Sequence, residues 1–220
     1  MNIALSPPSS LRRAALALAV LGGAWLPAAH GFTAAIDAGD RALFLQVGAG
    51  TMTNGNFNNR GRPGNNTTVN LVSVTVPAAQ LGSGTALPMA TDSTVAISPW
   101  DGFTFCNSPA TTGQVYVGGF YRVPGNNNAG AASFTVTTPA NLTSTAGDTI
   151  PFSTIAWISS GNGDNATTIP STGFTGGAQS LMSVNRNTWF ESCLTFRYLN
   201  TQLVPAGTFN GTATYTLTAP

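Results

Sequence analysis

Residues 208–218 read TFNGTATYTLT, and this stretch decides the fold class. Threonine or asparagine occupies every even position, whereas the odd positions hold Phe209, Gly211, Ala213, Tyr215 and Leu217. Successive side chains of a strand point to opposite faces, so strict alternation predicts a half-buried β-strand. We expect this strand to pair with another, because an unpaired strand would leave a backbone edge exposed.

The same period of two recurs upstream, while helical periodicity is almost absent. It predicts strands at 41–47, 68–76, 114–123, 132–138, 150–159 and 188–198, with shorter ones at 94–98, 102–106 and 181–184. Segments rich in Asn, Gly and Pro, such as 54–66, 124–130 and 159–168, separate them as turns. In 114–123, Gly118 and Gly119 suggest a bulge or bend.

About nine or ten short strands at this spacing predict an all-β fold. The expected architecture is an antiparallel β-sandwich of immunoglobulin-like, Greek-key type.

The N-terminus has the pattern of an export signal. Arg12 and Arg13 precede an apolar stretch at 14–26, and Ala29 and Gly31 offer the small residues that a signal peptidase requires. We therefore predict a signal peptide at 1–31 and a single β-sandwich domain at 32–220. The apolar run is shorter than the roughly 20 residues of a membrane span, which disfavours a membrane anchor. No other stretch is long and apolar enough, so no span is expected after cleavage. The expected location is the periplasm, the cell surface or the exterior.

Cys106 and Cys193 are the only cysteines. In an exported chain such a pair predicts a disulfide. The bond would close a long loop and stabilise the fold by about 4–5 kcal/mol in the chain-entropy model. The alternative is a reactive thiol, which is disfavoured because no His or Lys occurs after residue 30 to lower a thiol pKa.

Charged residues are scarce in 32–220. Six arginines stand against six aspartates and one glutamate, Glu191, giving a net charge of −1. Such a chain lacks the basic footprint of a nucleic-acid-binding protein and a polybasic patch for anionic lipid. The shortage of proton-transfer groups also argues against an enzyme.

The polar residues offer few metal or cofactor sites. Asn162, Asp164 and Asn165 could supply oxygens to calcium, but no EF-hand pattern surrounds them. Zinc is disfavoured because His is absent after residue 30 and the cysteines suit a disulfide. The aspartates are interpreted as turn caps, although two of them could meet in a cleft. We expect no cofactor and no metal.

Three tryptophans of 32–220 could stack on a sugar ring. Trp157 and Trp189 lie in predicted strands and are expected in the core, whereas Trp100 lies outside them. Trp100 and Asp101 are therefore the candidate ligand contacts, with a packed aromatic residue as the alternative.

Residues 205–209 (PAGTF) and the alternating tail resemble the ending of bacterial fimbrial subunits of the chaperone–usher type and of spore-coat-U-like secreted proteins. Gly207 is fourteenth from the end, where those subunits also have glycine. The resemblance implies an immunoglobulin-like sandwich completed by a neighbour's strand. The implied strand-pairing residues are Gly207, Phe209, Gly211, Ala213, Tyr215 and Leu217. The implied partners are copies of the chain itself or a periplasmic chaperone.

The sequence thus predicts a non-enzymatic secreted or periplasmic protein with a structural or adhesive surface role, of which a fimbrial-type subunit is one form. The alternative hypothesis is a β-sandwich module that binds carbohydrate or another surface ligand.

Overall fold

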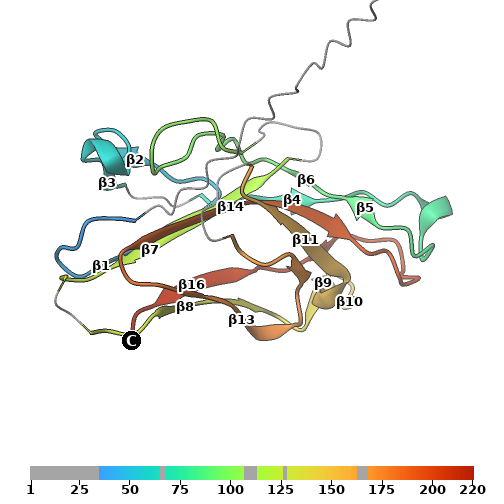
Figure 1. Ribbon diagram of the computed structural model, residues 1–220. Coiled ribbons are helices and arrows are strands. Elements are labelled where there is room, and N and C mark those ends of the chain that lie inside the picture. The colour runs from blue at the N-terminus through green and yellow to red at the C-terminus, as the bar shows by residue number, and fades with distance from the viewer. Residues whose placement is uncertain (1–34, 65–67, 107–112, 126–127, 163–167) are drawn as a thin grey trace, which may run out of the picture.

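The computed structural model describes residues 35–64, 68–106, 113–125, 128–162 and 168–220. The fold is an all-β antiparallel sandwich, as predicted (Figure 1). Its described residues form sixteen strands, seven of which are only two residues long, and three short 3-10 turns. The predicted signal peptide at 1–31 lies outside the described residues. Within the described ranges, no helix is long and apolar enough to cross a bilayer.

The largest sheet, here called the central sheet, has the strand order β1-β7-β14-β11-β12, with β5 also paired to β14. Its strands are β1 (Ala42–Val47), β5 (Leu87–Pro88), β7 (Val115–Arg122), β11 (Ile155–Ser160), β12 (Thr172–Gly173) and β14 (Thr188–Tyr198). β1, β7 and β14 follow the predicted ranges to within a residue at each end, whereas the range predicted as one strand at 150–159 divides into the end of β10 (Thr149–Pro151), a 3-10 turn and β11.

A second layer, here called the lower layer, lies beneath the central sheet in Figure 1. It joins two three-stranded sheets, β13-β8-β16 and β10-β9-β15. Their bounds are β8 (Ala132–Thr138), β9 (Asn141–Ser144), β10 (Thr149–Pro151), β13 (Gly177–Val184), β15 (Phe209–Asn210) and β16 (Thr214–Thr218). Only two residues separate β8 from β9, so the two sheets form one bent layer. Two small ladders pair β2 (Met52–Thr53) with β3 (Arg62–Pro63), and β4 (Val72–Ser73) with β6 (Ala90–Thr91).

The C-terminal segment forms two strands rather than the single strand predicted at 208–218. β15 pairs with β9, and β16 pairs with β8. The chain bends between them at Gly211, where a Cβ atom would come within 2.7 Å of the Phe152 ring and 2.8 Å of Leu142. The predicted faces are correct along β16, because Tyr215 and Leu217 are half-buried against the core while its threonines are exposed.

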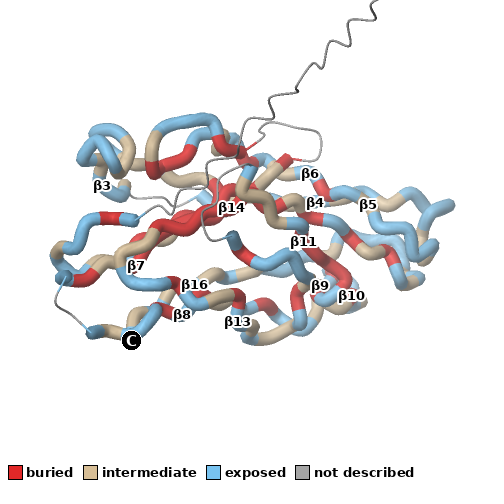
Figure 2. Tube along the Cα trace, in the orientation of Figure 1, coloured by how far each residue is buried: buried red, intermediate tan, exposed pale blue. Residues whose placement is uncertain are grey.

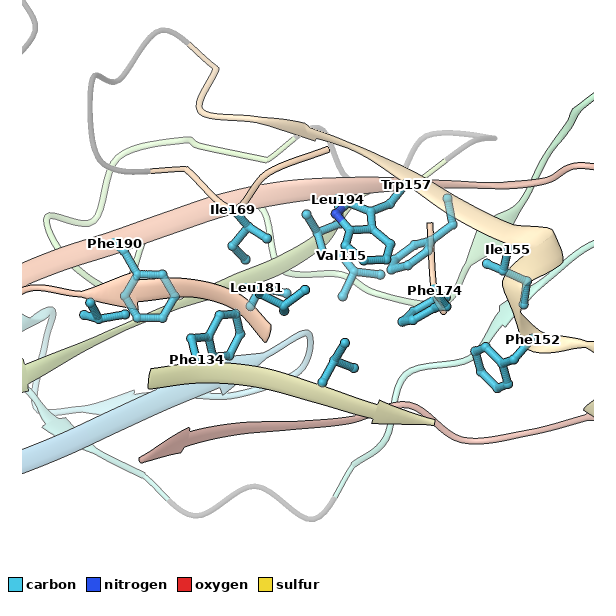
Figure 3. Packing of buried hydrophobic residues seen from close by; sticks show 14 of the residues in the cluster. Val115, Phe134, Phe152, Ile155, Trp157, Ile169, Phe174, Leu181, Phe190 and Leu194 are labelled. Atoms are coloured by element: carbon cyan, nitrogen blue, oxygen red, sulfur yellow. The ribbon is translucent and has the colours of Figure 1, made fainter. Parts of the chain in front are cut away.

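The main core fills the space between the two layers. In Figure 3, Phe134 of β8 and Leu181 of β13 face Phe190 and Leu194 of β14. Trp157 joins this core, and its indole N–H donates to the Pro170 carbonyl oxygen at 3.0 Å.

The central sheet is buried on both faces, which is why β7 and β14 are almost continuously red in Figure 2. Three segments, 35–41, 48–64 and 95–106, supply the side chains that cover its outer face and are here called the loop layer. The segment 95–106 contains an irregular hairpin in which Ile97 bridges Thr104. Strands covered on both faces have nearly unbroken apolar sequences, as VYVGGFY at 115–121 does.

Gly118 and Gly119 do not form the bulge that the sequence suggested. The pairing of β7 with β1 and with β14 continues through both residues without a register shift. A Cβ atom on Gly119 would collide with the carbonyl oxygen of Phe44 on the neighbouring strand. The glycine is therefore required for a close approach between backbones, the other usual reason for glycine inside a strand.

We expect Gly119→Ala to lower the free energy of unfolding by about 1–3 kcal/mol, because the added methyl group meets backbone that can move only with its strand. Urea unfolding measures the change. Gly130→Ala is the matched control, since an added Cβ there has no atom within 4 Å. Equal stability of the two variants would contradict the explanation.

Candidate functional site

The only glutamate of the chain lies beneath the loop layer. Glu191 projects from the outer face of β14 and is 1% exposed. Its carboxylate accepts hydrogen bonds from the Ser98 hydroxyl, at 2.8 Å to Oε2 and 3.1 Å to Oε1, and from the Tyr116 hydroxyl at 2.8 Å. Ser98 Oγ also accepts the Trp100 backbone N–H at 3.1 Å. The carboxylate therefore ties the hairpin in 95–106 to the middle of the central sheet.

Burial dominates the electrostatics of this group. It raises the pKa of Glu191, while hydrogen bonds from Ser98 and Tyr116 and the nearby Trp189 indole oppose the rise, and Asp101 adds to it. The Trp189 N–H makes no hydrogen bond of normal geometry, so the indole acts on the Glu191 carboxylate only electrostatically. Burial and the adjacent Glu191 carboxylate raise the pKa of Tyr116 well above its usual value. Tyr116 therefore remains a hydrogen-bond donor.

This arrangement fits a structural brace better than acid–base chemistry. A general acid or base must reach the proton that it transfers on a substrate. Glu191 is almost fully buried, and both of its oxygens are already hydrogen-bonded. It lines neither of the two surface depressions described below.

A disulfide forms a second anchor of the loop layer. Cys106 and Cys193 are bonded, as predicted, with their Cα atoms 5.5 Å apart. Both are at most 1% exposed and pack with Phe105 and Tyr116. Cys193 lies two residues beyond Glu191 on the same face of β14, so the covalent bond and the carboxylate hold the same hairpin.

An aromatic cluster forms the third anchor. Its buried members are Ile36, Phe44, Trp100, Phe120 and Trp189, with Phe57 packed against them. The Trp100 ring stacks on Phe57 with centroids 5.4 Å apart and packs on Trp189 at 5.3 Å. Side chains of the loop layer and of the central sheet thus form one apolar cluster.

The candidate ligand contacts have different environments. Trp100 is 8% exposed, and its ring is held between Phe57 and Trp189. Asp101 is half-buried in the turn of the hairpin, where its side chain accepts the Phe103 N–H at 3.0 Å. A role for Trp100 and Asp101 in ligand contact stays a prediction.

Two depressions lie at the end of the sandwich where β7 ends and β14 begins. The first has a volume of about 340 Å³, and its lining includes Asp37, Phe57, Asn58, Arg60, Trp100 and Arg122. The second, of about 480 Å³, is lined by Asn128, Ala129, Gly130, Ala131, Asn185 and Arg186. Both combine polar side chains and arginine, and the first adds aromatic side chains.

The remaining candidate residues are dispersed. The predicted strand-pairing residues that lie within strands pair with β8 and β9 of the same chain, while Gly207 is exposed ahead of them. Of the calcium candidates, Asp164 and Asn165 lie outside the described residues, and Asn162 donates its side-chain N–H to the Phe105 carbonyl oxygen. The described part of the chain contains no group of three or more His, Cys, Asp or Glu suited to a metal ion.

The brace of Ser98, Tyr116 and Glu191 was missed in the sequence. The sequence did contain a signal for it. The single glutamate lies in a predicted strand two residues before Cys193, so both side chains point to the same face. A carboxylate that is buried beside a disulfide needs hydrogen-bond partners, so this pattern indicates hydroxyl or amide donors near Glu191.

No protein-family model, curated protein or solved structure matches this chain. Its function therefore has to be inferred from its own residues.

Replacing both cysteines by serine should lower the free energy of unfolding by about 4 kcal/mol, because the loop between them is long. Urea unfolding measures the loss, and the parent protein treated with reductant is the control. In intact-mass measurements, reduction should add the mass of two hydrogen atoms. Two free thiols in the untreated protein would contradict the bond.

Glu191→Gln should remove a pH dependence of stability. The folded protein binds the Glu191 proton more tightly than the unfolded chain, because burial raises its pKa. This contribution is complete at low pH and is lost as the pH rises through the raised pKa. The parent should therefore lose stability relative to Glu191→Gln as the pH rises, in urea unfolding at a series of pH values. Asp40→Asn is the control because it removes an exposed carboxylate. Parallel curves for the parent and Glu191→Gln would contradict the assignment.

Proposed function

We propose that this chain is an exported, non-enzymatic surface protein with an adhesive or structural role, and that its loop layer is the part presented to a partner. The observation that carries the proposal is the bracing of that layer. An aromatic cluster, a buried carboxylate and a disulfide all hold it to one face of the central sheet. Loops fixed by a rigid scaffold suit recognition, because little conformational entropy remains to be lost on binding.

The chemistry of the chain supports this class. The disulfide is compatible with an oxidising, exported location. Glu191, whose pKa is raised by burial, is hydrogen-bonded to Ser98 and Tyr116 within the brace, so it contributes rigidity rather than proton transfer.

A fimbrial-type subunit is a specific form of this proposal. β1 lies at one edge of the central sheet, β16 lies at an edge of the lower layer, and the two strands are close neighbours. A strand from a second copy or from a chaperone could add to either edge by main-chain hydrogen bonds. An N-terminal donor segment does not suit this form, because Ile36 is already buried in the aromatic cluster of its own chain and only residues 32–34 lie between the predicted cleavage site and Ala35.

The proposal is tested by producing the whole chain in a bacterium and following its location and the adhesion of the cells. We expect an exported, disulfide-bonded protein and increased retention of the cells on polysaccharide-coated or host-cell surfaces. The variant with both cysteines replaced by serine should still be exported, but fewer cells should be retained on these surfaces. Its loop layer lacks the disulfide and is therefore held less rigidly.

A chain deleted of 1–31 is the control for export. Cytoplasmic accumulation of the full chain with free thiols would contradict the proposal, as would retention equal to that of cells lacking the protein. A stable monomer in gel filtration would exclude the fimbrial form and leave the adhesive one. Heat-resistant multimers would support the fimbrial form.

A further inference from the structure

The arginines of this chain are unevenly distributed. Six occur in 32–220, and five of them gather at the end of the sandwich that holds both depressions: Arg41, Arg60, Arg62, Arg122 and Arg186. We call this region the arginine end. The sixth, Arg197, lies near the opposite end of β14, about nine residues and roughly 30 Å along the strand from Thr188.

The strand pairing fixes this grouping. Arg122 pairs with Ala42, which directly follows Arg41. Arg186 bridges Tyr121, the neighbour of Arg122. The end of β7 therefore brings three arginines together.

Segment 48–64 of the loop layer contributes the other two arginines, Arg60 and Arg62. Arg60 ends the 3-10 turn at Phe57–Asn59, whose Phe57 packs against Trp100. Arg62 lies in β3 opposite Thr53, and the adjacent Met52 packs against the same aromatic cluster. Arg60 and Arg62 are both exposed.

The distribution gives the molecule an electrostatic polarity. Asp37, Asp40 and Asp101 also lie at the arginine end, and the buried Glu191 lies next to it beneath Ser98, so its formal net charge is +1. The other described charges, Arg197, Asp92 and Asp148, have a net charge of −1. An anionic ligand is therefore attracted to the arginine end rather than to the rest of the surface.

The first depression supplies the local chemistry for such a ligand. Its lining combines Arg60 and Arg122 with one carboxylate, Asp37, the amide of Asn58 and the aromatic Phe57 and Trp100, so the two guanidinium groups outnumber the acid. A guanidinium group binds a carboxylate or sulfate through two parallel hydrogen bonds. Amides and aromatic surfaces complement the hydroxyls and the apolar faces of sugar rings. The second depression repeats the combination of arginine and amide with Arg186, Asn128 and Asn185.

We propose that the arginine end binds an acidic polysaccharide, a chain of sugars that carries carboxylate or sulfate groups. This inference rests on the proposed adhesive function and names the class of its ligand. A repeating polymer fits two depressions of similar chemistry at one end of the molecule. Nucleic acid fits less well, because three aspartates interrupt the positive charge and a phosphate backbone requires a denser basic surface.

The experiment measures binding of the exported protein to immobilised polygalacturonate and heparin, with dextran as the neutral polysaccharide and double-stranded DNA as the phosphate polymer. We expect binding to at least one acidic polysaccharide that weakens with added salt, and none to dextran. The double variant Arg60→Gln/Arg122→Gln should bind at least about tenfold more weakly, since it removes both charged hydrogen-bond donors of the first depression.

Arg197→Gln is the control for position, since it removes one arginine charge far from the depressions, and its affinity should be unchanged. Arg122 Nε also donates to the Asp40 carbonyl oxygen at 3.1 Å, so the double variant could lose stability. Arg60→Gln/Arg62→Gln avoids that contact and should also weaken binding. Thermal unfolding verifies that each variant is folded.

Several outcomes would overturn the inference: no binding to either acidic polysaccharide, equal losses in Arg197→Gln and the double variants, or equal affinity for DNA or dextran. If cells that display Arg60→Gln/Arg122→Gln still adhere as the parent does, the ligand assignment fails while the adhesive function stands. If parent cells do not adhere, the proposed function itself fails.

Discussion

The structure depends on covering the outer face of the central sheet. The inner face is buried by the lower layer, but β7 and β14 also carry aromatic and apolar side chains outward, and among the described residues only the short β2–β3 ladder and irregular segments lie there to receive them. Irregular loops take the place of a second sheet. Because loops have few regular hydrogen bonds of their own, they need other anchors. Within nine residues, Trp100 supplies apolar packing, Ser98 a hydrogen bond to Glu191 and Cys106 a disulfide.

The few charged residues of this chain are unevenly distributed in the structure. Because there are few of them, the position of each one has a large effect on the electrostatic field of the molecule. Glu191 is buried, where a carboxylate attracts its hydroxyl partners strongly, and most arginines lie at one end. The threonine- and asparagine-rich remainder keeps the surface hydrated without adding charge.

The sequence predicted the elements that periodicity can define. β8 and β14 have the predicted bounds, and the disulfide followed from a single pair of cysteines in a chain with an export signal. Two-residue strands such as β4 are too short to leave a periodic pattern, so the range 68–76 was predicted as one strand. The bend at Gly211 and the close approach at Gly119 depend on neighbours distant in the sequence. The same is true of the brace, because Ser98 and Tyr116 reach Glu191 only after the sheet has formed.

The disulfide also limits how far this protein can be stretched. Cys106 and Cys193 are 87 positions apart, and the segment between them contains β7 to β13 and the beginning of β14. A tensile force applied through the two termini would bypass that segment, because the load passes through the sulfur–sulfur bond. At about 3.4 Å per extended residue, the bond withholds roughly 300 Å of chain from extension. A molecule pulled through its termini would thus keep β7 to β13 out of the load path while its outer segments are pulled straight.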